Sequence, residues 1–344
     1  MIIDRKVFAV PYNGTTELVK SVIDTGLHEQ TYEFYGTDNA FISGRTNINT
    51  GFPSPEDFES DVKLMLENDI KFNYLLNGTH MDYYIANWEL IEEKLKQLRD
   101  MGVTILTIVH PFMVRNIRSK GFDFHIRNSV NNFIECVDQA EMFLEAGYDS
   151  LIIDEDELRN IPLIQKIVKA CKVPVEVMIN NTCTRKCIHR FSHQSISSDP
   201  YIDDEGGKKF QNLAFALCSS VYRSNLSMFL KSCWVRPEDL ERYLAIGVSL
   251  FKLTGRQGPT DYILRCLSIY ASGSYTGNVL DYLATKGVPS HYGLKKLEAK
   301  YVEPYFEHVW NDCERDNCPK CQVIADQITE ALKKENLLFP QGRV

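Results

Sequence analysis

The sequence predicts an α/β fold: a (β/α)8 TIM-type barrel with a short C-terminal helical, cysteine-containing appendage. Eight short apolar runs alternate with amphipathic stretches, and a glycine-containing joint between helix and strand recurs three times. Such alternation is typical of βα units around a parallel sheet. A doubly wound open sheet is the alternative. Against it, no G-x-G-x-x-G follows the first strand, where the chain reads Tyr-Asn-Gly-Thr.

The candidate strands are short and mostly rich in β-formers, as strands buried on both faces should be. They lie at 6–11, 32–35, 72–76, 103–109, 150–153, 174–179, 232–235 and 249–253. Between them, apolar residues recur at helical spacing. These helical patterns lie at 55–67, 81–101, 131–146, 161–171, 237–246 and 260–271.

The recurring joint is a glycine that ends a helical pattern shortly before an apolar strand, at Gly102, Gly147 and Gly247. Glycine adopts the left-handed conformation that closes a helix, so the chain can turn into the next strand. We expect the barrel to occupy residues 1–285, with its site at the C-terminal strand ends. Residues 286–344 are predicted to form the extension, with helices at 294–309 and 325–334 around a cysteine cluster.

The composition restricts the class of protein. Hydrophobic residues make up 44% and charged residues 24% of the 344 residues, as in a globular protein with a core. The net charge of -8, without a basic patch, makes nucleic acid an unfavourable partner. We expect no membrane contact and a cytoplasmic location, because no long apolar run and no signal-peptide core are present. In that compartment, ten cysteines favour metal ligation over structural disulfides.

Polar side chains follow the ends of most predicted strands, where a barrel carries its chemistry. In chain order they are Asn13, Asn77, His80, His110, Asp154, Glu155, Asp156, Asn180, Asn181, Cys183, Arg236, Lys252, Thr254 and Arg256. The alternative for the three acids is capping of the following helix. For His110, which precedes a proline, the alternative is packing of the loop.

These residues suggest roles around a small organic substrate. His110, Asp154 and Glu155 are the candidate acid/base groups. The candidate substrate-binding residues are Asn13, Asn77, Asn181, Arg236, Lys252 and Arg256. Among them, the three cations could hold a carboxylate or a phosphate.

Four thiols follow or lie within the later elements: Cys183, Cys187, Cys218 and Cys233. Thiolates hold zinc or iron–sulfur clusters, and four make a full ligand set for either. The C-x3-C spacing is looser than a pair of C-x2-C zinc knuckles, which weakens the zinc interpretation. Free cysteines are often buried apolar residues, and that is our interpretation of Cys136, Cys171 and Cys266, which fall within helical patterns.

A second group, Cys313, Cys318 and Cys321, lies in the predicted extension. Its C-x4-C-x2-C spacing is also the local spacing of plant-type ferredoxin ligands. These thiols could bind a second cluster, or a zinc ion with a fourth ligand such as His308. They could instead complete the first site.

The run Asn180-Asn-Thr-Cys-Thr-Arg-Lys-Cys187, then Cys218, Cys233-Trp-Val-Arg-Pro-Glu-Asp-Leu and Phe251-Lys-Leu-Thr-Gly-Arg256 resembles the collagenase-like peptidase family U32. The resemblance implies a barrel and a [4Fe-4S] cluster on Cys183, Cys187, Cys218 and Cys233. Several members of that family take part in oxygen-independent hydroxylation of ubiquinone precursors or of tRNA. The sequence contains neither G-x-S-x-G nor H-E-x-x-H, so it offers no motif for the peptidase label.

Three hypotheses follow. The first is an iron–sulfur enzyme, with one or two [4Fe-4S] clusters, that carries out hydroxylation or related redox chemistry on a small molecule. The second is a metal-dependent peptidase or amidase with zinc instead of a cluster. The third is a non-catalytic, cluster-bearing subunit that pairs with a homologous partner or with a second copy of itself.

Overall fold

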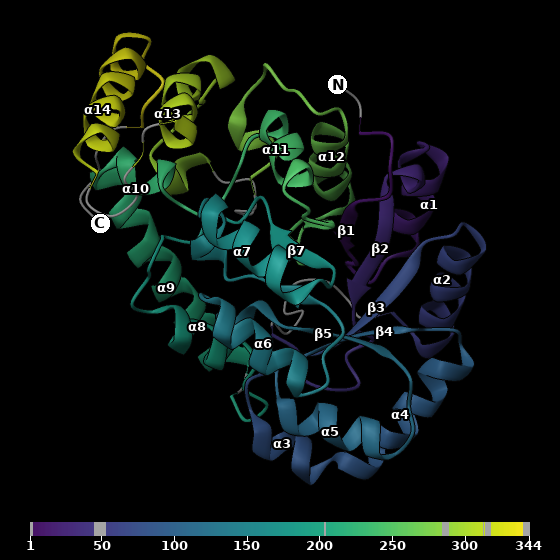
Figure 1. Ribbon diagram of the computed structural model, residues 1–344. Coiled ribbons are helices and arrows are strands. Elements are labelled where there is room, and N and C mark those ends of the chain that lie inside the picture. The colour runs from purple at the N-terminus through teal and green to yellow at the C-terminus, as the bar shows by residue number, and fades with distance from the viewer. Residues whose placement is uncertain are drawn as a thin grey trace.

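The computed structural model describes residues 3–44, 53–202, 204–283, 289–311, 313 and 318–339. In these ranges the strands form one eight-stranded sheet, with the order β5-β4-β3-β2-β1-β8-β7-β6 and every pairing parallel (Figure 1). The outer strands β5 and β6 are joined by an isolated parallel bridge between Arg127 and Ser150. The sheet is therefore a nearly closed barrel, which confirms the predicted fold class.

The observed strands match seven of the eight predicted runs. They are β1 (Phe8–Pro11), β2 (Thr31–Gly36), β3 (Lys71–Leu76), β4 (Ile105–Ile108), β5 (His125–Asn128), β6 (Leu151–Ile152), β7 (Val175–Met178) and β8 (Leu250–Lys252). The prediction at 232–235 was wrong, because this segment makes only an isolated antiparallel bridge, from Trp234 to Asn180. Its apolar character reflects the burial of Trp234 between Phe229 and Phe306.

The helices mostly cover the predicted ranges. They are α1 (Thr16–Asp24), α2 (Pro55–Glu67), α3 (Met81–Ala86), α4 (Trp88–Asp100), α5 (Pro111–Ser119), α6 (Val137–Glu145), α7 (Ile161–Cys171), α8 (Arg190–Ser197), α9 (Asp204–Ser224), α10 (Leu226–Leu230), α11 (Leu240–Ala245), α12 (Thr260–Ala271), α13 (Ala299–Asn311) and α14 (Pro319–Lys334). The pattern at 81–101 is split at Asn87, which ends α3 and precedes α4. No helix in the described ranges has both the length and the apolar content needed to cross a bilayer.

The three joint glycines have the conformation that the sequence predicts. The backbone φ angles are 87° at Gly102, 102° at Gly147 and 93° at Gly247. These positive values lie in a region that other residues adopt only at a cost. The glycines therefore end α4, α6 and α11 and allow the chain to turn toward β4, β6 and β8.

The barrel interior contains a buried polar layer below the C-terminal strand ends. Arg127 of β5 donates to Glu33 of β2 at 2.6 Å and to Glu176 of β7 at 2.7 Å. Lys252 of β8 lies 3.5 Å from the other oxygen of Glu176. Two cations thus face two carboxylates in the interior. The polarity of β5 explains why it was missed, since its arginine faces inward rather than toward solvent.

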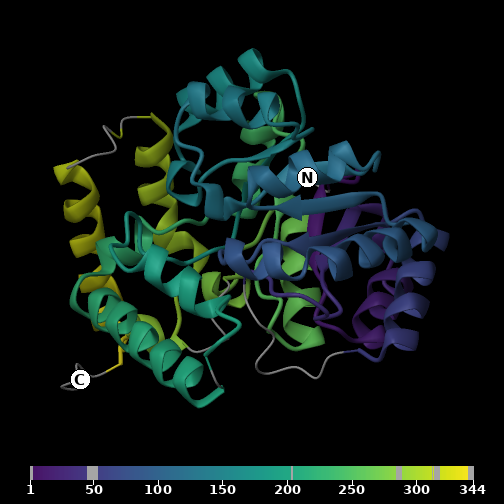
Figure 2. The ribbon, with the colours of Figure 1, turned by 90° about the horizontal axis from the view of Figure 1, so that it is seen from below.

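The connection between β7 and β8 is long and carries α8 to α11. Figures 1 and 2 show α13 and α14 beside this insertion, on one side of the barrel. α14 contacts both α10 and α13. The predicted domain boundary at residue 285 falls outside the described residues, so it stays a prediction.

Candidate active site and metal centre

The barrel mouth contains a cavity of about 290 Å³. Several residues singled out from the sequence lie in its wall: Asn77, Glu155, Asn181, Cys183, Lys252 and Arg256. Its charged side chains comprise four cations, which include Arg190 and Arg265, and two carboxylates, Glu155 and Asp261. The wall therefore contains more cations than carboxylates, and Arg190, Lys252 and Arg265 have carboxylate partners in Asp154, Glu176 and Asp261.

Arg190, at the start of α8, organises the three acids that follow β6. Its Nη1 lies 3.1 Å from Asp154 Oδ1, 3.5 Å from Glu155 Oε1 and 2.8 Å from Asp156 Oδ2. Its Nη2 donates to the other oxygen of Asp154. The guanidinium also lies over the ring of Phe133, 4.5 Å from the centroid. Arg190 is thus a fixed counter-ion for the acids, and other cations must bind an anionic ligand.

The three acids are not equivalent. Burial raises the pKa of Asp154 and of Glu155, and the charge of Arg190 opposes that rise. Both oxygens of Asp154 are engaged by Arg190. Glu155 accepts a hydrogen bond from Asn181 and faces the cavity. Glu155 is therefore better placed than Asp154 to exchange a proton with a bound molecule.

The two cations from the end of β8 have different environments. Lys252 is 8% exposed, and its Nζ lies 3.9 Å from the ring centroid of Tyr35. Burial lowers the pKa of Lys252, while the neighbouring carboxylate of Glu176 opposes this change. Arg256 donates from Nη2 to Ser43 Oγ at 2.9 Å. Both cations line the cavity and can approach an anionic ligand there.

The two candidate asparagines outside the acid cluster hold loops in place. Asn77 accepts from the Gly44 amide at 2.8 Å and donates to Ser129 Oγ at 3.3 Å, at the cavity wall. Asn13 is buried and donates to Thr260 Oγ1 at 3.3 Å. Asn13 therefore connects β1 to the start of α12.

Four candidates are not among the described residues of the cavity wall: Asn13 and Asp154, described above, and the pair His110 and Arg236. His110 precedes α5, where its ring packs edge-on against Tyr84 at 5.8 Å, and burial lowers its pKa. Arg236 makes two hydrogen bonds of 2.9 Å to Asp239 and lies over the ring of Phe306. The structure thus places both side chains in packing and ion-pair roles away from the cavity.

The β7–β8 connection carries the four thiols Cys183, Cys187, Cys218 and Cys233, none of them in a disulfide. Burial raises the pKa of Cys218, and the nearby Cys187 raises it further. Burial also raises the pKa of Cys233, with a smaller contribution from Cys183. Cys183 and Cys218 both raise the pKa of Tyr222. Charge effects therefore link Cys187 to Cys218 and Cys183 to Cys233, and no three of these four described thiols have the spacing of ligands to a single ion.

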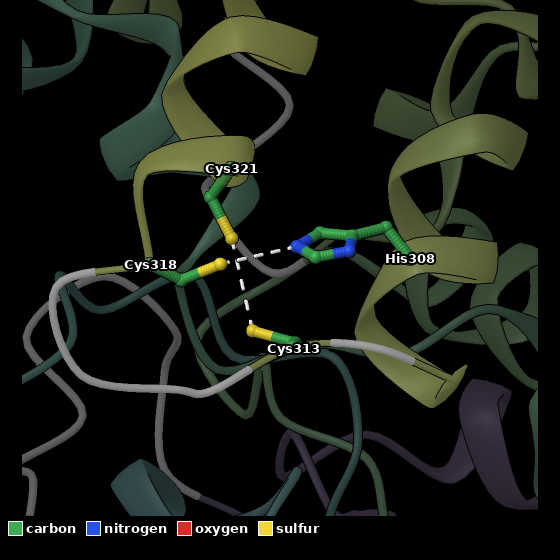
Figure 3. Close-up of side chains that lie close together, drawn as sticks. All are labelled: His308, Cys313, Cys318 and Cys321. Atoms are coloured by element: carbon green, nitrogen blue, oxygen red, sulfur yellow. Dashed lines mark hydrogen bonds between the residues drawn. The ribbon is translucent and has the colours of Figure 1, made fainter.

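That closer spacing occurs in the C-terminal extension. His308, Cys313, Cys318 and Cys321 place their ligand atoms within 4.8 Å of one another, and they could hold a metal ion. Figure 3 shows the imidazole from α13 and the three sulfurs converging on one point. Cys313 Sγ lies 3.8 Å from Cys321 Sγ, and His308 Nε2 lies 3.2 Å from Cys318 Sγ. Burial and the neighbouring thiols raise the pKa of Cys321 to about 12.

The two cysteine groups meet at a second, smaller cavity of about 50 Å³. Cys233 contributes to its wall from one side, and Cys313 and Cys321 contribute from the other. Asp156 also lines it, and its Oδ1 lies 3.5 Å from Cys233 Sγ. The acid cluster and both thiol groups are therefore adjacent parts of the molecule.

A comparison with protein-family models supplies the family. The model of peptidase family U32 matches residues 14–275, which includes most of the barrel and all of the β7–β8 connection. The chain belongs to this family.

Individual relatives of this U32 protein are distant. It is 24% identical over 351 residues to an uncharacterized protease of Methanocaldococcus jannaschii, with 95% of this chain and 99% of the relative covered. The solved structure of a U32 peptidase is 13% identical and has a TM-score of 0.45, over 59% of this chain and 83% of that one. N-acetylneuraminate lyase from Mycoplasma synoviae is 11% identical and has a TM-score of 0.41, over 95% and 98% of the two chains.

The sequence of this U32 protein did not single out Arg190, although the residue organises the acid cluster. An arginine in the first turn of a helix is unfavourable beside the positive end of the helix dipole, so that position indicates an anionic partner. The sequence did not predict α8, however, so this signal could be read only once the structure placed Arg190 at the start of that helix.

Proposed function

We propose that this U32 family member is an iron–sulfur-dependent enzyme that carries out redox chemistry on a small anionic organic molecule at the barrel mouth. Oxygen-independent hydroxylation is the reaction class that we favour. One observation carries the proposal: Cys183, a candidate cluster ligand, lines the same cavity as the cations Lys252 and Arg256. A redox group and a site for an anion would then lie next to each other.

We assign the [4Fe-4S] cluster to the four thiols of the β7–β8 connection. None of Cys183, Cys187, Cys218 and Cys233 is in a disulfide, and charge effects link Cys187 to Cys218 and Cys183 to Cys233. Each thiolate would bind a different iron, so the ligand sulfurs would stand farther apart than around one ion. A cluster bound there would supply one-electron transfer.

The protein's own side chains would bind and orient the substrate. Arg256 and Lys252 provide positive charge for a carboxylate, and the planar arginine favours a two-point contact. Glu155 would exchange a proton with the substrate, since burial raises the pKa of this carboxyl and it faces the cavity. Asn181 donates to Glu155 and would fix the orientation of its carboxyl group.

The cluster is tested by anaerobic purification followed by iron and sulfide analysis and visible absorption. We expect about four irons per chain, bound by Cys183, Cys187, Cys218 and Cys233. The substitutions Cys183→Ala and Cys218→Ala should each remove this iron. Cys171→Ala is the matched control, because Cys171 is a partly buried cysteine at the end of α7. Protein that turns over substrate without iron would reject the proposal.

The substrate class is tested by calorimetric titration with small carboxylates and their neutral amides. A hydrogen bond to a charged group contributes about 1.5–3 kcal/mol, so Arg256→Met should weaken carboxylate binding roughly 10- to 100-fold. Lys96→Met removes an exposed cation of α4 and should leave binding unchanged. Equal binding of the amides would exclude an anionic substrate.

The family name alone favours a peptidase, and the site geometry gives that alternative little support. A catalytic zinc keeps an open position for water, whereas the group with single-ion spacing supplies four protein ligands. Such a closed set favours a structural ion. A hydrolase would therefore need a different metal site.

A further inference from the structure

We propose that His308, Cys313, Cys318 and Cys321 bind one structural Zn²⁺ ion, which fastens α13 and α14 to the segment that carries Cys233. This inference goes beyond the proposed function and does not depend on it. It concerns the metal, its role, and the part of the molecule that it holds together.

The distances fit a single tetrahedral zinc. Zn–S bonds of about 2.3 Å at tetrahedral angles put two ligand sulfurs about 3.8 Å apart. The sulfurs of Cys313 and Cys321 are separated by 3.8 Å. With a Zn–N bond of about 2.0–2.1 Å, the nitrogen-to-sulfur separation is about 3.6 Å. His308 Nε2 and Cys318 Sγ are 3.2 Å apart, a few tenths of an ångström less than this value, and no two of the four ligand atoms lie more than 4.8 Å apart.

The same distances argue against a disulfide, an iron–sulfur cluster or simple apolar packing of these thiols. A disulfide requires about 2.05 Å between sulfurs, whereas Cys313 Sγ and Cys321 Sγ lie 3.8 Å apart and none of the three cysteines is in a disulfide. A [4Fe-4S] cluster would separate the thiolates, since each binds its own iron. Buried cysteines that served only as apolar filler would have no reason to turn three sulfurs and an imidazole toward one point (Figure 3). Three cysteines and one histidine are a known structural zinc set.

The sequence around these residues prepares the site. Cys318 and Cys321 form a C-x2-C pair across the start of α14, with Pro319 in the first helical position. Proline there adopts the helical backbone angle without losing a hydrogen bond. The free amides and the dipole at this helix start favour thiolates. His308 lies in the last turn of α13, so one ion would join the ends of two helices.

Charge at the site also suits this ligand set. Three thiolates, a neutral imidazole and Zn²⁺ leave one net negative charge, after three thiol protons have passed to solvent. The small cavity that Cys313 and Cys321 line also carries three cations, Arg159, Arg185 and Lys231, against two carboxylates, Glu155 and Asp156. These cations lie beside the position where the negative charge would develop.

The two joined helices hold the segment around Cys233. Arg159 donates to the carbonyls of Leu230 and Trp234 and lies over the ring of Phe306 of α13. Trp234 packs against Phe306 with ring centroids 4.8 Å apart. From α14, Gln322 accepts hydrogen bonds from two residues at the start of α10. An ion that fixes α13 to α14 would therefore stabilise the contacts that these two helices make with the chain around residues 230–234.

The first test measures zinc and iron separately in the full-length protein, purified anaerobically without chelators. We expect one zinc per chain in the wild type. His308→Ala and Cys318→Ala should lose it, whereas Cys183→Ala and the control Cys171→Ala should retain it. His308→Cys should also retain zinc, because four thiolates form an equivalent site. Zinc without iron would refute the proposed function and leave this inference intact.

The second test uses Co²⁺ in place of zinc in the wild-type chain, so it does not depend on the folding of variants. Bound Co²⁺ should show the visible bands of a tetrahedral ion and a thiolate charge-transfer band, and Zn²⁺ should displace it. Wild-type protein that retains no zinc from zinc-supplemented medium and binds no Co²⁺ would overturn the inference. Iron that is lost from Cys318→Ala but not from Cys183→Ala would also overturn it.

The structural role is tested by fluorescence during chelation. Trp234 and Trp310, two of the three tryptophans, lie in this interface, where Trp310 Nε1 donates to Asp239 at 2.7 Å. Removal of zinc should expose them and shift their emission to longer wavelength, and added zinc should reverse the change. Complete zinc removal without a change in emission would show that the ion does not hold the helices.

Discussion

Replacement of Arg127 by methionine should be among the most destabilising single changes in the barrel. Arg127 is 3% exposed, and its partners Glu33 and Glu176 are 0% and 1% exposed. Three N–O contacts of 2.6, 2.7 and 3.2 Å hold the group. Burial by itself would raise the pKa of Glu33, but Arg127, together with Asn73 and Lys252, outweighs burial and keeps that pKa below its ordinary value.

The magnitude follows from the charge that is left behind. Arg127→Met leaves two buried carboxylates, Glu33 and Glu176, with one nearby cation, Lys252, which lies 3.5 Å from Glu176. Breaking a buried ion pair in this way costs about 3–5 kcal/mol of unfolding free energy. The control is Arg99→Met, which removes an exposed pair with Asp100 and should cost about 0–1 kcal/mol. Urea unfolding followed by circular dichroism measures both.

The pH dependence gives a second check on the same change. In the wild type the lowered pKa of Glu33 stabilises the fold above the unfolded pKa, and this contribution disappears as the pH falls through the folded pKa. Without Arg127, burial should raise the pKa of Glu33, so protonation would relieve the stranded charge. The loss of unfolding free energy caused by Arg127→Met should therefore be larger at pH 8 than at pH 5. A loss no larger than that of Arg99→Met, or a deficit that grows in acid, would refute the reasoning.

Two further changes test the packing. Gly247→Ala should destabilise the fold by about 1–3 kcal/mol, because φ is +93° and the new Cβ would lie 2.7 Å from Val168 Cγ1. The control is Gly26→Ala, which has a positive φ but no atom near the new Cβ and therefore measures backbone strain alone. Equal losses of unfolding free energy in the two variants would exclude a contribution from the clash. Acidification should destabilise the fold through His291, because burial lowers the pKa of this side chain to about 4 and keeps it neutral in the folded protein. The unfolded chain then binds more protons than the folded one. The free energy of unfolding should therefore fall by about 2 kcal/mol between pH 7 and pH 5 relative to that of His291→Phe. An equal change with pH in both proteins, measured by urea unfolding, would contradict this.

The sequence predicted the parts of the fold that follow from local chemistry. α2, α7 and α12 begin and end as predicted, because apolar spacing agrees there with a proline at the helix start, and α2 and α7 also have polar side-chain caps. The joint glycines identified the βα repeat. β5 could not be found this way, since Arg127 is buried by partners from β2 and β7 that lie far away in the sequence. Conversely, the apolar run around Trp234 was predicted to be a strand, although its apolar character serves packing against Phe306 of α13.

The site divides along the same line. Residues at strand ends were predictable, because a parallel barrel brings the carboxyl ends of its strands together. Arg236 shows the limit of that rule: the segment before it is not a strand, and Asp239, three residues later, engages its guanidinium. Arg190 shows the opposite case, because it reaches the acids only through the folding of the β7–β8 connection.

The buried ion layer also bears on which cation an anionic substrate would meet first. Arg127 holds Glu176 at 2.7 Å, whereas Lys252 lies 3.5 Å from the same carboxylate. If a substrate anion drew Lys252 away, Arg127 alone would face both Glu33 and Glu176, which is the same balance of one cation and two carboxylates that Arg127→Met leaves. Burial lowers the pKa of Lys252, and an added anion would favour its charged form. The layer beneath the cavity would therefore hold Lys252 near Glu176, which leaves Arg256 as the cation that an anionic substrate would meet first.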